Sequence, residues 1–176
     1  MILSVVKYGS KILRTKCLLV EDINEEIRQL VFNMVETMDA AKGIGIAAPQ
    51  VGHLLRIFVL RNYIEKGEDS FEISSDYQVY INPKILSVSK ETAFEVEGCL
   101  SIPGVREEVE RPLKIEIEAL DLEGNLFKET LFGYNARVRL HENDHLHGVL
   151  FIDRIAKNRR KKIDPVLKQL EAKFFS

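Results

Sequence analysis

The chain has 176 residues, of which 45% are hydrophobic and 30% charged, so it can form one ordinary globular domain with its own core. A net charge of −2 gives no global basic field, and we expect no specific DNA binding. The sequence has neither an apolar run of the roughly 20 residues that span a membrane nor a signal peptide, so we expect a cytoplasmic protein without membrane attachment.

Hydrophobic spacing predicts the first elements. Apolar residues recur at helical spacing over residues 24–41, which predicts an amphipathic helix capped by Asp22 or Asn24 and ending at Gly43. Runs typical of strands follow at residues 56–60, 78–81, 85–88, 114–120 and 126–131. The polar stretch 62–76 is expected to be a long surface excursion between strands.

Two more helices complete the prediction. One begins near Asn135 and carries the string His141-Glu142-Asn143-Asp144-His145; the last begins at Asp164, with Pro165 in its first turn. Strands grouped between helices indicate an α+β fold. We expect one domain over residues 1–176, with antiparallel sheets packed around the central helix and with an N-terminal and a C-terminal helix.

The HExxH string predicts a metal site. Residues four apart share one face of a helix, so His141 and His145 can bind one ion. Glu142 lies about 100° further round the helix, where it can take a proton from a water whose pKa the ion lowers to about 7. Apolar neighbours indicate that this helix is partly buried, and burying these groups without partners is costly.

A catalytic site of this kind needs a third protein ligand and an open position. The candidates are Cys17, His53, Cys99 and Glu171. Cys17 lies among leucines and is best interpreted as a small core residue. Cys99 lies beside Gly98, and we expect an irregular loop there because Pro103 and Gly104 follow. A thiol near a cation ionises and coordinates, which favours Cys99 and leaves the alternatives open.

Small residues dominate the segment Gly43-Ile44-Gly45-Ile46-Ala47-Ala48-Pro49-Gln50, which allows close approach of the backbone to another group. Gln50 ends this apolar run, and a buried amide needs partners. One suitable partner is the oxygen that becomes negative when water attacks a carbonyl group.

Taken together, the segments 43–50, 97–101 and 141–145 resemble the motifs GxGxAAxQ, EGCLS and HExxH of the peptide deformylase family, in that order. Leu140 departs from the glutamine that commonly precedes HExxH in that family. The resemblance implies a hydrolase that removes the N-formyl group from the N-terminal formylmethionine of nascent proteins and releases formate.

The resemblance also implies residue roles. Cys99, His141 and His145 would bind one divalent metal ion, usually Fe(II), with Zn, Ni or Co as substitutes. Glu142 would be the general acid and base. Gln50 and the backbone N–H of Leu100 would stabilise the oxyanion.

The substrate pocket is expected to be lined by Ile44, Gly45 and Ile46, with Arg106 and residues 140–142 beside it. The backbone of Gly45 can pair with an extended peptide. We expect a monomer whose basic run 157–162 is either a solvated face or a contact with ribosomal RNA. The alternatives are an HExxH metalloprotease that uses a downstream carboxylate such as Glu171, and a closed structural zinc site in an interaction module.

Overall fold

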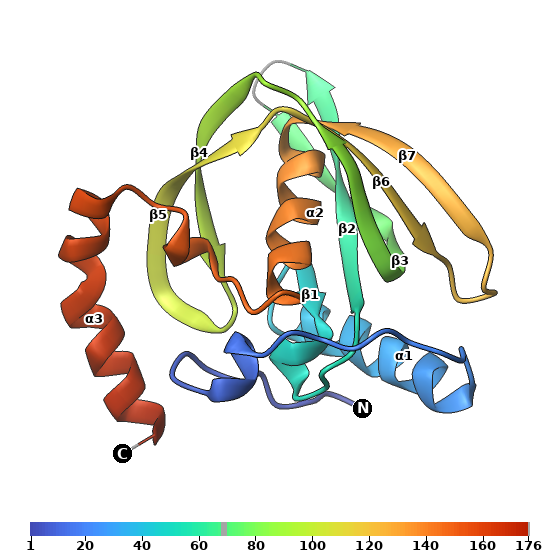
Figure 1. Cartoon of the computed structure of the whole chain (residues 1–176), viewed down its shortest axis with the longest axis horizontal. Helices are drawn as coiled ribbons and strands as arrows, with labels where there is room; N and C mark the ends of the chain where they lie inside the picture. The colour runs from blue at the N-terminus through green and yellow to red at the C-terminus, as the bar shows by residue number, and fades with distance from the viewer. Residues whose placement is uncertain (68–69, 176) are drawn as a thin grey trace.

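The computed structural model describes residues 1–67 and 70–175. Its elements in chain order are α1 (Glu25–Ala40), β1 (Gly45–Ala47), β2 (Ile57–Gly67), β3 (Ser70–Val88), β4 (Thr92–Cys99), β5 (Ile102–Pro112), β6 (Lys114–Leu120), β7 (Leu126–Phe132), α2 (Gly133–His145) and α3 (Lys157–Phe175). One antiparallel sheet has the order β1-β2-β3-β6-β7, and β4 pairs with β5 in a second. Figure 1 shows α2 between the two sheets, which confirms the predicted α+β fold around a central helix.

Helix α1 follows its sequence signals closely. The Asn24 side chain accepts a hydrogen bond from the Ile27 N–H at 3.1 Å and caps the start. At the end, the Gly43 N–H donates to the Met38 carbonyl at 2.9 Å. The left-handed position before it, usually a glycine, is taken by Lys42 with φ 55°. The chain therefore leaves the right-handed helical conformation at Lys42, one residue before Gly43, where the sequence predicted the end.

The excursion at 62–76 is a two-stranded arm rather than a loop, apart from residues 68–69, which lie outside the described residues. Strand β2 runs on to Gly67, and β3 begins at Ser70 and continues through both predicted strands, 78–81 and 85–88. Most residues of the arm are polar and exposed, and its apolar residues Tyr63, Ile64, Phe71 and Ile73 are few and scattered. Such a short, mostly exposed pattern is hard to distinguish from a loop.

Cys99 lies at the end of a strand and not in an irregular loop. Strand β4 pairs with β5 from Thr92 to Cys99, and the register shifts between Gly98 and Cys99. Gly98 pairs with Arg106 and Cys99 with Ile102, so residues 103–105 have no partner on β4. A proline and a glycine with φ 79° fit this irregularity without breaking the hairpin.

The start predicted for the last helix was wrong. Helix α3 begins at Lys157, not Asp164, and Pro165 lies inside it. A proline inside a helix loses its own N–H bond and crowds the carbonyl of the residue four positions before it, so α3 continues through Pro165 despite that cost. The basic segment before Pro165 completes two turns. Helix α2 begins at Gly133, close to the expected Asn135. No helix among the described residues is both long and apolar enough to cross a membrane.

Helix α2 is fixed against the larger sheet by apolar packing. Ala136 of α2 and Leu146, the residue directly after the helix, are buried with Phe58, Tyr80 and Ile117 of that sheet in one core cluster. Because the helix is held along its length, side chains on its other side face β4 and β5 at defined positions. This packing is what places the HExxH string opposite the strand that carries Cys99.

Candidate metal centre and active site

Three metal-binding side chains meet between α2 and the end of β4. The donor atoms of Cys99, His141 and His145 all lie within 4.8 Å of one another. Cys99 Sγ is 3.4 Å from His145 Nε2. The two histidines come from successive turns of α2, as their spacing predicted, while the sulfur comes from the hairpin. Among the described residues, this is the group that can hold an ion with three ligands.

The other candidate ligands lie elsewhere. Cys17 is buried in the core, where burial raises the pKa of its thiol to about 11. His53 is exposed after the short turn that contains Gln50. Glu171 on α3 packs against Gly9, and the two line a separate cleft. A metalloprotease site that uses Glu171 is therefore not assembled.

Glu97 orients one of the histidines. Its Oε2 is 2.9 Å from His141 Nδ1. Arg111 donates to both carboxylate oxygens, at 2.7 and 2.9 Å, and Arg137 Nη1 donates to Oε1 at 2.8 Å. Burial opposes ionisation of Glu97, but the bonds from Arg111 and His141 outweigh it and hold its pKa well below the ordinary value. The anionic carboxylate thus directs Nε2 of His141 toward the metal site.

A second carboxylate extends this buried network. Asp144 accepts from Arg111 Nη1 at 2.7 Å and from Arg154 Nε and Nη2 at 2.6 Å. The sequence interpretation missed Glu97, Arg111 and Arg137 as functional residues. Glu97 is the first residue of the EGCLS string, so its proximity to Cys99 in the sequence could have indicated a role. No local pattern connects the two arginines to the site.

The electrostatics and the donor set fit a bound cation. Burial, reinforced by His141, lowers the pKa of His145, so its imidazole is neutral, as metal binding requires. Burial also disfavours a charged His141, but bonds to Cys99 and Glu97 raise its pKa well above the ordinary value. Positive charge is therefore stabilised at this position. His145 Nδ1 and Glu142 Oε2 are buried without hydrogen-bond partners among the described residues.

Glu142 lies beside the three donors, almost fully buried. Burial raises the pKa of its carboxyl group to about 7. The carboxylate rests on Gly45 of β1, where a Cβ atom would come within 2.5 Å of Oε1. Glycine is thus the residue that lets strand β1 and the HExxH helix approach this closely.

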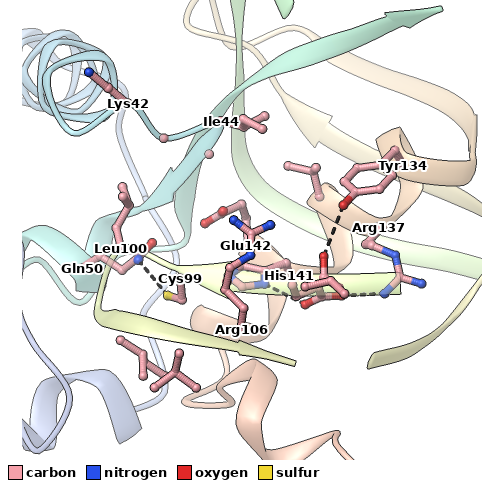
Figure 2. A pocket seen from close by; sticks show the side chains of 18 of the residues that line it. Lys42, Ile44, Gln50, Cys99, Leu100, Arg106, Tyr134, Arg137, His141 and Glu142 are labelled. Carbon is pink, nitrogen blue, oxygen red and sulfur yellow. Dashed lines mark hydrogen bonds and ion pairs between the residues drawn. The ribbon is translucent and has the colours of Figure 1, made fainter. Parts of the chain in front are cut away.

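Gln50 points its amide nitrogen into the site. Its Oε1 accepts from the Ala47 N–H at 2.8 Å, which fixes the orientation of the side chain. Its Nε2 donates to Ser101 Oγ at 3.1 Å and to Cys99 Sγ at 3.4 Å. Figure 2 shows Gln50 and Cys99 on one side of the cavity, Tyr134 and Arg137 on the other, and His141, Glu142 and Arg106 between them.

The cavity beside these groups has a volume of about 400 Å³. Ile44, Gly45 and Arg106 line it, in agreement with the sequence interpretation. Two expectations need correction. The Ile46 side chain alternates away from the cavity and is fully buried in the core, and Leu140 packs against the core cluster around Tyr80. Further lining residues that the sequence did not predict are Tyr63, Val96, Tyr134 and Val138.

One cysteine sulfur and two imidazoles beside a buried carboxylate of near-neutral pKa, at the end of a cavity in an α+β fold, define a metal-dependent hydrolase. The family model described as polypeptide deformylase matches residues 2–161. The chain belongs to the peptide deformylase family, and its activity is that of a peptide deformylase, which acts on formylated nascent peptides.

Relatives and solved structures agree. Peptide deformylase 1 of Clostridium perfringens is 49% identical over 81% of this chain and 90% of its own length. The crystal structure of the peptide deformylase of Ehrlichia chaffeensis is 37% identical and covers 98% of both chains with a TM-score of 0.87. That of Plasmodium falciparum is 35% identical, covers 97% of this chain and 96% of its own, and also has a TM-score of 0.87.

Proposed function

We propose that Cys99, His141 and His145 hold one Fe(II) ion, and that the residues around it remove the formyl group from formylmethionyl peptides. The convergence of these three donors beside Glu142 is the observation that supports the proposal most strongly. When bound, such an ion supplies a Lewis acid that polarises the formyl carbonyl and acidifies water. A thiolate with two imidazoles suits Fe(II) and also Zn, Ni or Co.

Glu142 is the group that moves the proton. A carboxyl group with a pKa of about 7 can both accept and donate a proton at neutral pH. It takes a proton from the attacking water and returns it to the amine that leaves. Because Oε2 has no partner among the described residues, that oxygen is available for both transfers.

Gln50 and the Leu100 N–H stabilise the negative oxygen that forms during attack. The Ala47 N–H holds the Gln50 carbonyl oxygen, which leaves the NH₂ group to donate into the site. Leu100 lies at the tip of the β4–β5 hairpin. Lys7 Nζ donates to the Leu100 carbonyl at 2.9 Å and the Tyr8 N–H to the Ser101 carbonyl at 2.8 Å, so the N-terminal segment steadies that tip.

The peptide chain of the substrate extends along β1. This strand is at the end of its sheet and pairs with β2, so its other edge is available to a peptide through the Gly45 backbone. Ile44 and Arg106 flank that path. The methionyl side chain enters the apolar part of the cavity, which is lined by Tyr63, Val96, Tyr134 and Val138.

The test is formate release from a formyl-methionyl peptide by protein that is loaded with iron and kept anaerobic, compared with the same protein after exposure to air. We expect turnover in the first and a loss in the second, because a thiolate beside Fe(II) is sensitive to oxygen. Cys99→Ser should lose the ion and the activity. Retention of the ion by that variant, together with cleavage of internal peptide bonds, would support the metalloprotease instead.

The basic run 157–162 is proposed to contact ribosomal RNA, which would place the enzyme near its nascent substrate in the cytoplasm. Arg159 pairs with Glu107 and Glu108, and Arg160 with Asp164. The contact would therefore depend on the exposed lysines of the run, Lys157, Lys161 and Lys162. Reversing the charge of these three should weaken co-sedimentation with ribosomes; unchanged co-sedimentation would contradict the proposal.

We also propose that residues 1–176 act as one domain and as a monomer. Helix α2 contacts strands of both sheets, which supports a single folding unit. Analytical ultracentrifugation and a single cooperative unfolding transition would test these two points.

A further inference from the structure

The arm at 62–76 begins at an irregularity in the β2–β3 pairing. Arg61 pairs with Tyr77, but Tyr63 pairs with Ile73. Three residues of β3, 74–76, therefore lie opposite the single residue Asn62. Such a bulge redirects a strand and the side chains that follow it. Tyr63, the first residue beyond this bulge, lines the substrate cavity.

Asn135, in the first turn of α2, holds the backbone of Tyr63 from both sides. Its Oδ1 accepts from the Tyr63 N–H at 2.9 Å, and its Nδ2 donates to the Tyr63 carbonyl at 2.9 Å. Arg139 Nη1 lies 3.4 Å from the same Oδ1. Because a guanidinium can only donate, Arg139 favours the orientation of the amide in which both bonds to Tyr63 are made.

Arg139 also ties the bulge itself to the helix. This side chain is fully buried, and a buried guanidinium is costly unless its donors are satisfied. It donates to Asn62 Oδ1 at 2.6 Å, to Gln78 Oε1 at 2.6 Å and to Tyr80 Oη at 3.0 Å. Two residues one helical turn apart, Asn135 and Arg139, thus fix the two successive arm residues Asn62 and Tyr63.

The fixed residue forms an aromatic wall. The rings of Tyr63 and Tyr134 lie 4.6 Å apart between centroids, and Phe71 from the other strand of the arm packs on Tyr63 at 5.9 Å. The Tyr134 hydroxyl donates to the Val96 carbonyl at 3.2 Å, a contact drawn in Figure 2. Aromatic rings favour contact with a thioether sulfur and with unbranched apolar chains.

We propose that Tyr63 determines the preference of the cavity for the methionyl side chain, and that Asn135 is the positioning residue that holds Tyr63 in place. The arm at 62–76 is then a part of the substrate pocket. This inference rests on the proposed function, because it concerns the same cavity and the same substrate. Asn135 does not touch the substrate and acts only through the Tyr63 backbone.

The experiment compares Asn135→Leu with the natural protein on formyl-methionyl and formyl-alanyl tripeptides. Leucine has a similar size and removes both hydrogen bonds to Tyr63. We expect KM for the methionyl peptide to rise about tenfold with a smaller change in kcat, and the preference for methionine over alanine to fall about tenfold, as when a few methylene contacts are lost. Tyr63→Ala should lose the preference in the same way.

A double variant tests whether Asn135 acts through Tyr63. In the Tyr63→Ala protein, adding Asn135→Leu should cause no further loss of preference. Asn82→Ala is the matched control, because Asn82 makes the same pair of bonds to the backbone of Val20, at 2.8 and 2.9 Å, outside the cavity lining. This control should lower the unfolding temperature and leave the preference intact.

The outcomes separate the two proposals. A full preference for methionine in Asn135→Leu or in Tyr63→Ala overturns the inference, as do additive losses in the double variant. If Asn135→Leu does not fold, Asn135→Asp keeps the acceptor for the Tyr63 N–H and sets a carboxylate oxygen against the Tyr63 carbonyl in place of the donor. This variant should also lose preference for methionine, and an unchanged preference there again overturns the inference. Absence of formate release from both peptides by the natural, iron-loaded protein contradicts the proposed function instead.

Discussion

The carboxylate of Glu97 lies 2.9 Å from Nδ1 of His141, although the two residues belong to different elements and are 44 positions apart. Glu97 is two residues before Cys99 on β4, so one short strand supplies a ligand and also the group that orients a second ligand. The same carboxylate accepts from two guanidiniums. Metal binding and the stability of the fold therefore depend on one charged group.

Replacing that charge should affect both properties. In Glu97→Gln, the buried Arg111 and Arg137 lose their shared anion, and we expect a loss of about 3 kcal/mol in the free energy of unfolding. Metal affinity should fall about 10–100-fold because His141 is less firmly oriented. Chemical denaturation and a competition assay with a chelator measure the two effects. Glu108→Gln, a surface partner of Arg159, is the control and should cost less than about 1 kcal/mol.

Glu142→Gln should separate metal binding from catalysis. The amide keeps the shape of the side chain but cannot take up a proton, so kcat should fall by about 10²–10⁴-fold while the metal content stays the same. Glu171→Gln should change neither value, since Glu171 lies against Gly9 on the far helix. Full turnover by Glu142→Gln would remove Glu142 from its assigned role.

Gly45→Ala should reduce activity through Glu142. The new methyl group would lie 2.5 Å from Glu142 Oε1, so the carboxylate must move. A displacement of about 1 Å in a catalytic group costs about 10²-fold in rate. Gly98→Ala is the matched variant in the same cavity lining, because its Cβ would meet its nearest neighbour at 3.5 Å, an ordinary contact. An equal loss in both variants would show that crowding of the substrate, and not movement of Glu142, is responsible.

The buried thiol of Cys17 predicts a dependence of stability on pH. Burial raises its pKa from 9.0 to about 11, so between these values the unfolded chain releases a proton that the folded chain keeps. The stability that the protonated Cys17 thiol contributes to the folded state is fully present below about pH 9 and is lost as the pH rises toward 11. The difference in unfolding free energy between the natural protein and Cys17→Ala should narrow over that range. A difference that is constant from pH 8 to 11 would contradict this account.

Spacing within one helix could be read from the sequence, and pairing between distant segments could not. The helical repeat alone predicts that His141 and His145 share one face of a helix, and Asn24 is a typical capping residue that predicts the start of α1. Cys99 was one candidate among several until its motif was compared with a family, because nothing local says which strand will face α2. Arg111 reaches the site only through the β4–β5 register, which depends on long-range packing.

The two errors in the strands have one cause, and the error in the last helix has another. The arm at 62–76 and the hairpin around Cys99 depend on cross-strand partners, so polar or proline-containing strands were interpreted as loops. Asp164 and Pro165 carry a genuine helix-start signal, yet the residues before them already form helix α3, where Arg160 N–H donates to the Ala156 carbonyl at 2.9 Å. The preference of Asp164 and Pro165 for a helix start was overridden because the helix that begins at Lys157 continues through them.

The hairpin and the helix that share the metal site are separated in the chain by β6 and β7, whose connecting turn lies at Asp121–Asn125 and is exposed. Nothing in the geometry of the ligands fixes the number of residues in that interval, whereas the interval between the two histidines is set by the pitch of a helix. Over evolution, insertions and deletions should therefore accumulate at that turn and spare the five-residue string. A search for remote homologues should hold the string rigid and let its distance from the cysteine vary.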